Sequence, residues 1–308
     1  MPTSVPAIDT KSRSAVVQAY TDYYLPTVGV TIGWTGDLAT CVPGATSSAY
    51  RDATLIRLNY YRAMSGLNGD TTFDATQDAD WQSCALMMDA NNTLDHNPPP
   101  SWLCYTAGGD AAAALSDLAL DLAGAEAIGA YIDDNGTTNV AHRRWCLYQV
   151  QQTMAIGSTP GANAHGVLMP GGWGSDLAYS ETDLGTGWAS HPDYVRWTAW
   201  PPPRYCPYQI LPASSKMWSL TAASANYAAD FSAATVTMTK DNGGSSVTAN
   251  IQTIAAGFGD ETLVWSVPSI SYGAPGSDTD YEVTVAGVKI GTRGQTQTFT
   301  YTVTVIAP

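Results

Sequence analysis

Two histidines stand where the sequence restricts the backbone. His96 follows a predicted helix, and the three consecutive prolines after Asn97 impose an extended path. His142 opens the tetrapeptide HRRW, just after a predicted helix that Asn135 and Gly136 interrupt. Two neutral imidazoles and one or two carboxylates can bind a divalent cation such as zinc and leave a position for water. We therefore consider His96 and His142 as candidate metal ligands, with two structural histidines as the alternative.

The residues after His142 are a second concentration of polar chemistry in a chain with only 13% charged residues. Arg143 and Arg144 can form a fork for a carboxylate from the same domain, while Trp145 is predicted to lie in the core. Candidate carboxylates in this domain are Asp95, Asp117, Asp133 and Asp134. This stretch either forms a site or supports one.

Short motifs exclude several enzyme classes. The chain has no G-x-S-x-G nucleophile elbow, no H-E-x-x-H metalloprotease helix, no G-x-G-x-x-G turn after a strand and no G-x-x-x-x-G-K-[ST] phosphate loop. Serine hydrolases and nucleotide-binding enzymes of the common types are therefore disfavoured.

Charge and hydropathy limit the partners. The formal net charge of −14 repels polyanions, so we expect no nucleic-acid partner. No stretch approaches the roughly 18 apolar residues of a membrane-spanning helix. The N-terminal MPTSVPAIDTK lacks the basic start and apolar run of a signal peptide. We expect an exported, extracellular protein from which the export signal has been removed.

Five cysteines occur without any C-x-x-C pair, which favours disulfides over a zinc ribbon or a thioredoxin-type site. Cys41 and Cys104 flank the first two predicted helices, outside regular structure, and form the first-ranked pair. A second possible bridge joins Cys146 to Cys206 in the proline-rich connector. Reduced cysteines in the cytosol remain the alternative.

The elements that must position these residues follow from periodicity. Residues 1–46 are predicted as an extension with a few helical turns at AVVQAYTDYY, wrapping the domain of residues 47–199. That domain contains a helix capped by Ser47 or Ser48, a helix capped by Asp74, and a helical region over residues 117–134. Short strands follow at QTMAIGS and AHGVLMP. The fold class is therefore α+β.

The C-terminal third has a different period. Residues 200–212 form a proline-rich, extended connector. Residues 213–308 alternate apolar and polar side chains over roughly seven short strands, as in a β-sandwich of the immunoglobulin or fibronectin type.

The segments LIRLNYYRAMSGL, CALMMDANNTLDHNPPPSWLCYT and NVAHRRWCLY followed by TMAIGS, in this order, resemble the CAP superfamily. This superfamily includes cysteine-rich secretory proteins, antigen 5 and pathogenesis-related proteins, and the resemblance is to a bacterial branch with a G-H-R-R-W segment. The resemblance covers about residues 48–158. It implies an α-β-α sandwich, export, and a surface cleft in which two histidines and two acids can bind a divalent cation.

The resemblance also implies residue roles. The family histidines fall on His96 and His142, and Ala141 replaces the glycine before the second one. One family acid falls near LSDLA, where Ser116 stands and Asp117 is the nearest carboxylate. The other falls on Asp134, with Asp133 as the alternative. Arg143, Arg144 and Trp145 are expected to brace the loop that holds His142 toward the cleft.

Three functions compete at this stage. The leading one is an exported binding protein whose cleft takes a divalent cation, zinc or magnesium, or a small ligand. The second is metal-assisted hydrolysis, in which a metal on His96 and His142 polarises water and Asp134 acts as base. The third is an adhesive or structural subunit of an extracellular assembly, which self-assembles or binds a surface component through an exposed sheet edge.

Overall fold

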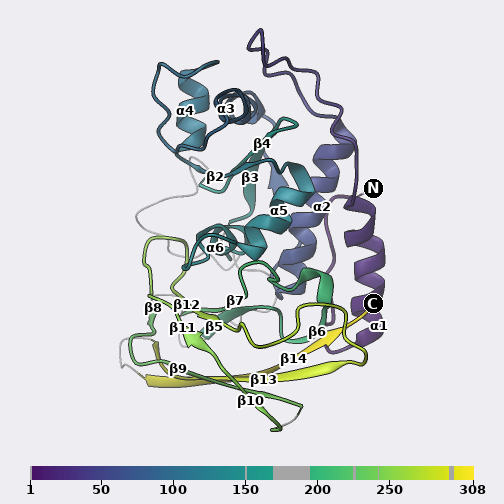
Figure 1. Ribbon diagram of the computed structural model, residues 1–308, viewed down its shortest axis with the longest axis vertical. Coiled ribbons are helices and arrows are strands. Elements are labelled where there is room, and N and C mark those ends of the chain that lie inside the picture. Colours follow the sequence, from purple (N-terminus) through teal and green to yellow (C-terminus); the bar gives the residue numbers. More distant parts are fainter. Residues whose placement is uncertain (1, 150, 169–194, 225–226, 242, 291–294) are drawn as a thin grey trace.

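The computed structural model describes residues 2–149, 151–168, 195–224, 227–241, 243–290 and 295–308. An N-terminal part of helices around a mixed sheet precedes a C-terminal part of β-strands (Figure 1). The helices of the first part are α1 (Arg13–Ala19), α2 (Ser48–Met64), α3 (Asp78–Asn91), α4 (Ala107–Ala113), α5 (Gly124–Asp133) and α6 (Ala141–Cys146). The chain is therefore α+β, as predicted.

The N-terminal sheet lies between two layers of helices. Its strands are β1 (Thr72–Phe73), β2 (Ser116–Leu120), β3 (Thr153–Ser158) and β4 (Ala162–Gly166), in the order β1-β3-β4-β2. Strand β1 runs parallel to β3, and the other pairs are antiparallel. Helices α3 and α4 pack on one face through Trp81 and Met88, and helices α2 and α5 pack on the other (Figure 1).

The two long helices of this part begin at polar caps. The side chain of Ser47 accepts the Tyr50 N–H and starts α2, which confirms the predicted cap. Helix α3 begins later than expected, because the Asp74 carboxylate accepts the Thr76 N–H and forms a turn before the helix.

The prediction of helix over residues 117–134 is wrong for its first residues. Residues Ser116–Leu120 form β2, which pairs with β4, and α5 begins only at Gly124. Leu118 packs on the α3 side of the sheet and Ala119 on the α2 side, so the alternation of period two decided the structure. Positive φ angles at Asp121 and Gly124 separate the strand from the helix.

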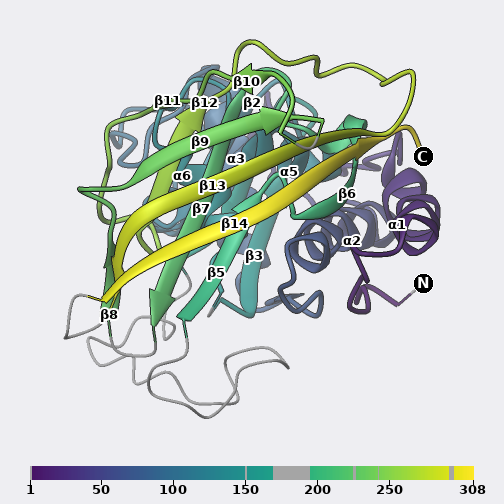
Figure 2. The same ribbon diagram turned by 90° about the horizontal axis from the view of Figure 1, so that it is seen from below.

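The C-terminal part is one connected ten-stranded sheet that folds over into two layers (Figure 2), joined where the strand Tyr227–Asp230 pairs with both layers. Trp218 and Tyr281 meet edge to face between them, and the Trp265 indole N–H points to the Met238 sulfur at 3.3 Å. Its strands are β5 (Val195–Trp200), β6 (Arg204–Pro207), β7 (Met217–Ser224), β8 (Tyr227–Asp230), β9 (Thr235–Lys240), β10 (Ser246–Val247), β11 (Asn250–Ile251), β12 (Thr262–Ser266), β13 (Thr279–Ile290) and β14 (Gln295–Ile306).

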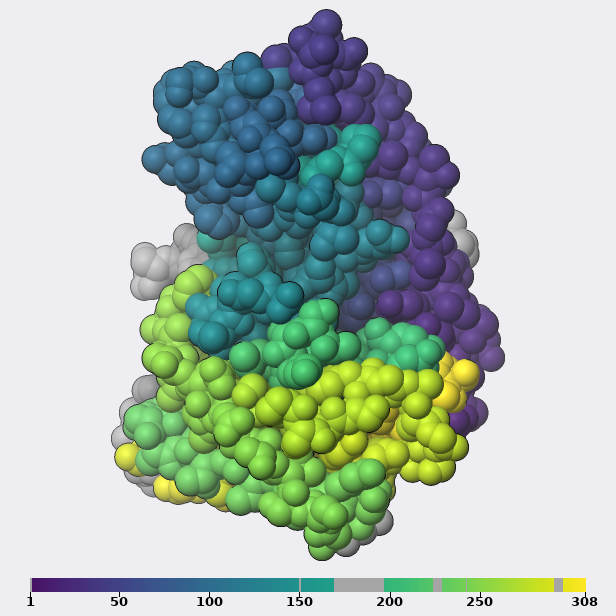
Figure 3. All heavy atoms as spheres, in the orientation of Figure 1, coloured from purple at the N-terminus to yellow at the C-terminus, as the bar shows by residue number. Residues whose placement is uncertain are grey.

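The two parts share one apolar core. Strand β5 pairs with β7, and β6, within the proline-rich residues 200–212, pairs with β14. The ring of Tyr61 from α2 packs against Trp200 of β5. The N-terminal segment runs along one side of both parts (Figure 3), and Arg13 forms an ion pair with Asp278. The predicted helical turns at residues 15–24 are confirmed as α1 and a π-helical stretch, Tyr20–Tyr24.

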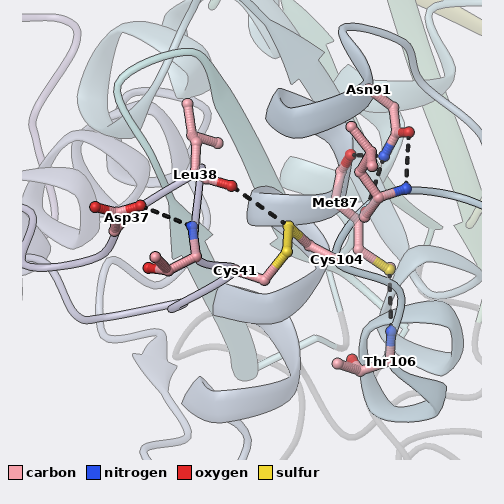
Figure 4. Close-up of a disulfide and its surroundings, with 9 residues drawn as sticks. Asp37, Leu38, Cys41, Met87, Asn91, Cys104 and Thr106 are labelled. Atoms are coloured by element: carbon pink, nitrogen blue, oxygen red, sulfur yellow. Dashed lines mark hydrogen bonds between the residues drawn. A yellow bond between two sulfur atoms is a disulfide. The ribbon is translucent and has the colours of Figure 1, made fainter.

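A disulfide joins Cys41 to Cys104, as the sequence predicted (Figure 4). It fixes the loop near Asp37 to the segment between α3 and α4 and closes a loop with a sequence separation of 63. The alternative bridge between Cys146 and Cys206 is wrong, because both thiols are free and buried. Cys146 faces the N-terminal sheet, whereas Cys206 lies on β6 beside β14.

Candidate functional site

His142 and Asp134 form a charged pair between α5 and α6. The His142 Nδ1–H donates to Asp134 Oδ1 at 2.8 Å. The His142 side chain is 29% exposed, whereas the Asp134 side chain is fully buried. The predicted histidine and the predicted acid therefore meet, with the imidazole on the outer side.

Local backbone geometry places the Asp134 carboxylate. Asp134 ends α5 with a left-handed conformation, and its own N–H still bonds to the Ala130 carbonyl. Its Oδ1 also accepts the Thr137 hydroxyl at 2.9 Å, and its Oδ2 accepts the Arg143 N–H near the start of α6 at 3.2 Å. These bonds orient the carboxylate before any ligand arrives.

Electrostatics keep the His142 imidazole protonated at neutral pH. Burial disfavours its charged form, but the hydrogen bond to Asp134 and the charges of Asp117 and Asp134 overcome that effect and raise the His142 pKa to about 9. The remaining ring nitrogen, Nε2, has no hydrogen-bond partner among the residues that the structure describes.

His96 lies in an exposed segment after α3. Its Nδ1–H donates to the Ala113 carbonyl at the end of α4, at 2.9 Å. No hydrogen bond links it to His142 or Asp134 within the described ranges. Ser116 is buried, and its hydroxyl donates to the Ala112 carbonyl rather than facing either histidine.

Asp133, the alternative acid, has a different role. Its carboxylate accepts the N–H groups of Ser214 and Ser215 at 2.9 and 2.8 Å. Asp133 therefore connects α5 to the C-terminal part, and Asp134 is the acid beside His142.

The residues HRRW join α6 to the C-terminal part. The buried Arg143 guanidinium donates to the carbonyls of Ile132 and Asp133 and to the Ser219 hydroxyl. Arg144 donates to the carbonyls of Ala255 and Asp260. The predicted carboxylate fork is wrong: in the described part of the chain both guanidinium groups bind backbone carbonyls, because α6 lies between the end of α5 and loops of the second part. Trp145 is buried beside Tyr148.

A second polar cluster lies inside the N-terminal sheet. Asp117 of β2 and His165 of β4 are register partners, and Cys146 ends α6 beneath them. The Cys146 Sγ lies 3.8 Å from Asp117 Oδ2 and 3.8 Å from His165 Nδ1. These side chains are buried, and their ligand atoms lie within 4.8 Å of one another. This interior cluster can hold a metal ion.

Burial governs the protonation of the interior cluster. It raises the pKa of Asp117 well above the ordinary range, against the opposing charge of His142. Burial likewise raises the pKa of the Cys146 thiol. For His165, burial and then the charge of Arg62 lower the pKa to about 3. At neutral pH His165 is therefore a neutral imidazole.

Tyr131 of α5 contacts one histidine of the outer pair and one of the interior cluster. Its ring centroid lies 5.5 Å from that of His142 and 6.0 Å from that of His165, on which it stacks. Its hydroxyl donates to the Asp117 carbonyl and to Asn163 Oδ1. The two histidines thus share one aromatic neighbour.

Sequence reasoning missed His165 and Cys146 as partners of Asp117. His165 was read only as part of an apolar strand, and Cys146 only as a candidate for a disulfide. The available signal was a histidine in the short, largely apolar run AHGVLMP, because a strand buried on both faces normally excludes an ionisable side chain.

Two surface pockets lie away from both clusters. One of about 510 Å³ and one of about 290 Å³ share Thr27, Val30 and Ala53, between the N-terminal segment and α2. Neither pocket is lined by His96 or His142.

Comparison with known proteins gives no match to a family model, and no curated protein matches significantly. Among the described residues, none of the helices is both long enough and apolar enough to cross a membrane. A disulfide in the chain indicates an oxidising compartment. The two polar clusters are therefore the basis for inferring the function.

Proposed function

We propose that this chain is an exported, CAP-like binding protein in which His142 and His96 bind a divalent cation through their Nε2 atoms. The observation that carries the proposal is that the Nδ1 atom of each histidine is hydrogen-bonded to an oxygen of the protein. His142 Nδ1 is held by the Asp134 carboxylate and His96 Nδ1 by the Ala113 carbonyl.

This arrangement is typical of metal-binding histidines. Such a histidine usually donates its second ring N–H to a carboxylate or a backbone carbonyl, which fixes the tautomer and the ring orientation. Both candidate histidines have this partner, and both are accessible to solvent. Because the His142 pKa is raised to about 9, zinc must displace the proton on its Nε2 at neutral pH, and binding releases that proton. Nitrogen donors favour zinc over magnesium, so zinc is the cation we propose.

The sequence resemblance and the layered fold support the same assignment. The sheet of the N-terminal part lies between α3 and α4 on one face and α2 and α5 on the other, as expected for a CAP-type α-β-α sandwich. The disulfide favours export. The C-terminal strands share a core with the first part, which favours a role as a rigid support.

Of the competing functions, hydrolysis is disfavoured by Asp134. A general base needs a free lone pair near the attacked water, but this buried carboxylate already accepts bonds from His142, Thr137 and the Arg143 N–H. We therefore assign Asp134 the orientation of His142 rather than a catalytic step.

The test is calorimetric titration of metal-stripped protein with zinc, beside His142→Gln and His96→Gln. We expect micromolar binding that each substitution weakens at least tenfold, and magnesium binding at least a hundredfold weaker. Asp133→Asn is the matched control, because its carboxylate faces Ser214 and Ser215 instead of His142. Equal zinc binding by both histidine variants and the wild type would refute the proposal.

A further inference from the structure

We infer that the interior cluster of Asp117, Cys146 and His165 is a second, structural binding site for a zinc-like divalent transition metal. The site is separate from the proposed outer one and goes beyond the proposed function. Its residues come from β2, from the end of α6 and from β4.

The spacing of the ligand atoms fits a single small cation. The Cys146 Sγ lies 3.8 Å from both Asp117 Oδ2 and His165 Nδ1. Ligand atoms around a tetrahedral zinc, with bonds of about 2.0 to 2.3 Å, lie roughly 3.3 to 3.6 Å apart. A contraction of a few tenths of an ångström therefore brings the two contacts of Cys146 to this spacing, the Asp117 and His165 ligand atoms start within 4.8 Å of each other, and a water can fill the fourth position.

The chemistry of the donors selects the metal class. A thiolate, an imidazole and a carboxylate suit zinc, cobalt and similar ions, whereas magnesium and calcium prefer oxygen ligands alone. A carboxylate and a thiolate together carry two negative charges, which a divalent cation balances. That balance matters because an uncompensated charge is costly in a buried site.

The surroundings supply this compensation only in part, through the charges of His142 on Asp117 and of Arg62 on Cys146. Asp117 makes no ion pair in the described part of the chain. The nearby Arg62 guanidinium is fully engaged by the carbonyls of Asn68, Cys146, Tyr148 and Gln151. The His165 Nε2 is buried without a hydrogen-bond partner among the described residues. The ligand atom in the cluster is the other ring nitrogen, Nδ1, which faces the Cys146 sulfur.

The connection to the fold explains what the metal would do. It would join the edge strand β2, the central strand β4 and the C-terminal end of α6, whose other end carries His142. We expect the metal ion to bind during folding, because all three side chains are buried in the folded chain.

The test is to unfold the full chain in denaturant with its Cys41–Cys104 disulfide intact, refold it without oxygen in the presence of cobalt(II), and then remove loosely bound metal by dialysis. We expect one retained cobalt per chain with thiolate-to-cobalt charge-transfer absorption, and a higher thermal unfolding midpoint than for metal-free protein. Cys146→Ser should lose the absorption. Cys206→Ser, a matched buried thiol on β6, should keep it.

Further variants separate folding defects and the two sites. Asp117→Asn preserves the packing of the carboxyl group, and we expect it to fold but to lose the stabilisation by cobalt. His142→Gln should keep the charge-transfer absorption even if it abolishes the outer site. Refolded wild-type protein without retained cobalt, or absorption that survives in Cys146→Ser, would overturn the inference.

Discussion

His142 and His165 both contact the ring of Tyr131, and their pKa values are shifted in opposite directions from that of an ordinary histidine. The pKa of His142 is raised to about 9, and that of His165 is lowered to about 3. Both lose solvation, but only His142 donates to a carboxylate. Burial therefore lowers the pKa of a histidine only where no carboxylate opposes it. At His142 the Asp134 carboxylate does so, and the imidazole is a cation at neutral pH.

The comparison also separates two kinds of acid. Asp134 accepts several hydrogen bonds and is held beside a cation, whereas Asp117 lies in the interior with a thiol and a neutral imidazole. The outer pair is arranged for contact with solvent and ligand. The interior cluster is arranged for proton-bearing neutral groups or for a metal that replaces their protons.

Acid should destabilise the metal-free protein most strongly through His165. The unfolded chain binds a proton on this residue near its ordinary pKa of 6.5, but the folded chain resists protonation until about pH 3. The stabilisation is thus present above pH 6.5 and lost as the pH falls, by about 5 kcal/mol at pH 3. Urea unfolding at several pH values gives the free energy of unfolding as a function of pH. This free energy should fall less steeply with decreasing pH in His165→Asn than in the wild type. Identical slopes would contradict the burial of a neutral imidazole.

Alkali should act through His142, with the opposite sign. The folded pKa of about 9 lies above the unfolded value of 6.5, so the stabilisation is complete below pH 6.5 and is lost as the pH rises through 9. The expected loss is about 3 kcal/mol in the free energy of unfolding. His142→Gln should lack this dependence, since glutamine donates without titrating. A wild-type stability that stays level from pH 6.5 to 9 would show that the pair is not charged.

Neutralising the two acids should have unequal effects. Asp134→Asn removes the charge that stabilises His142, and we expect a cost of about 2 kcal/mol at pH 7. Asp117→Asn replaces a carboxyl group whose pKa is already raised by burial, so we expect a cost below about 1 kcal/mol in metal-free protein. Chemical denaturation of both variants checks this order. An equal loss of unfolding free energy in the two variants would contradict the claim that Asp134 is charged and Asp117 is neutral in the metal-free protein.

The smallest effect is expected at Thr137. Its hydroxyl gives Asp134 one of its hydrogen bonds, so Thr137→Val should cost about 1 kcal/mol and lower the His142 pKa only slightly. Proton NMR of the imidazole gives the pKa, with the exposed Thr93→Val as control. A drop of the His142 pKa to its ordinary value would mean that Thr137, not the Asp134 charge, maintains the pair.

The sequence predicted the elements with strong periodicity better than the short strand. Helix α2 has a clear apolar stripe and a serine cap, and the C-terminal strands alternate regularly. The sequence predicts helix from residue 117 onward because Leu118 and Leu122 also fit a helical spacing, whereas Ser116–Leu120 form a strand. Five residues are too few for the sequence alone to distinguish the two periods.

The outer pair was also more accessible to sequence reasoning than the interior cluster. Asp134 and His142 are eight residues apart, across one loop. Cys146 is separated from Asp117 by 29 residues and from His165 by 19. Asp117 and His165 meet through strand register, and Cys146 reaches them through the packing of α6. A single sequence does not encode that register visibly, so the interior cluster emerges only when β2 and β4 are paired.

The most direct measurement of the central claim is a nitrogen-15 NMR titration of the histidine side chains with zinc. If His96 and His142 bind one cation, their Nε2 resonances should shift together along a single binding curve, while the interior His165 resonance stays in place. A shift of only one of the two Nε2 resonances, or of neither at millimolar zinc, would contradict a shared cation site and leave Asp134 and His142 as a structural ion pair.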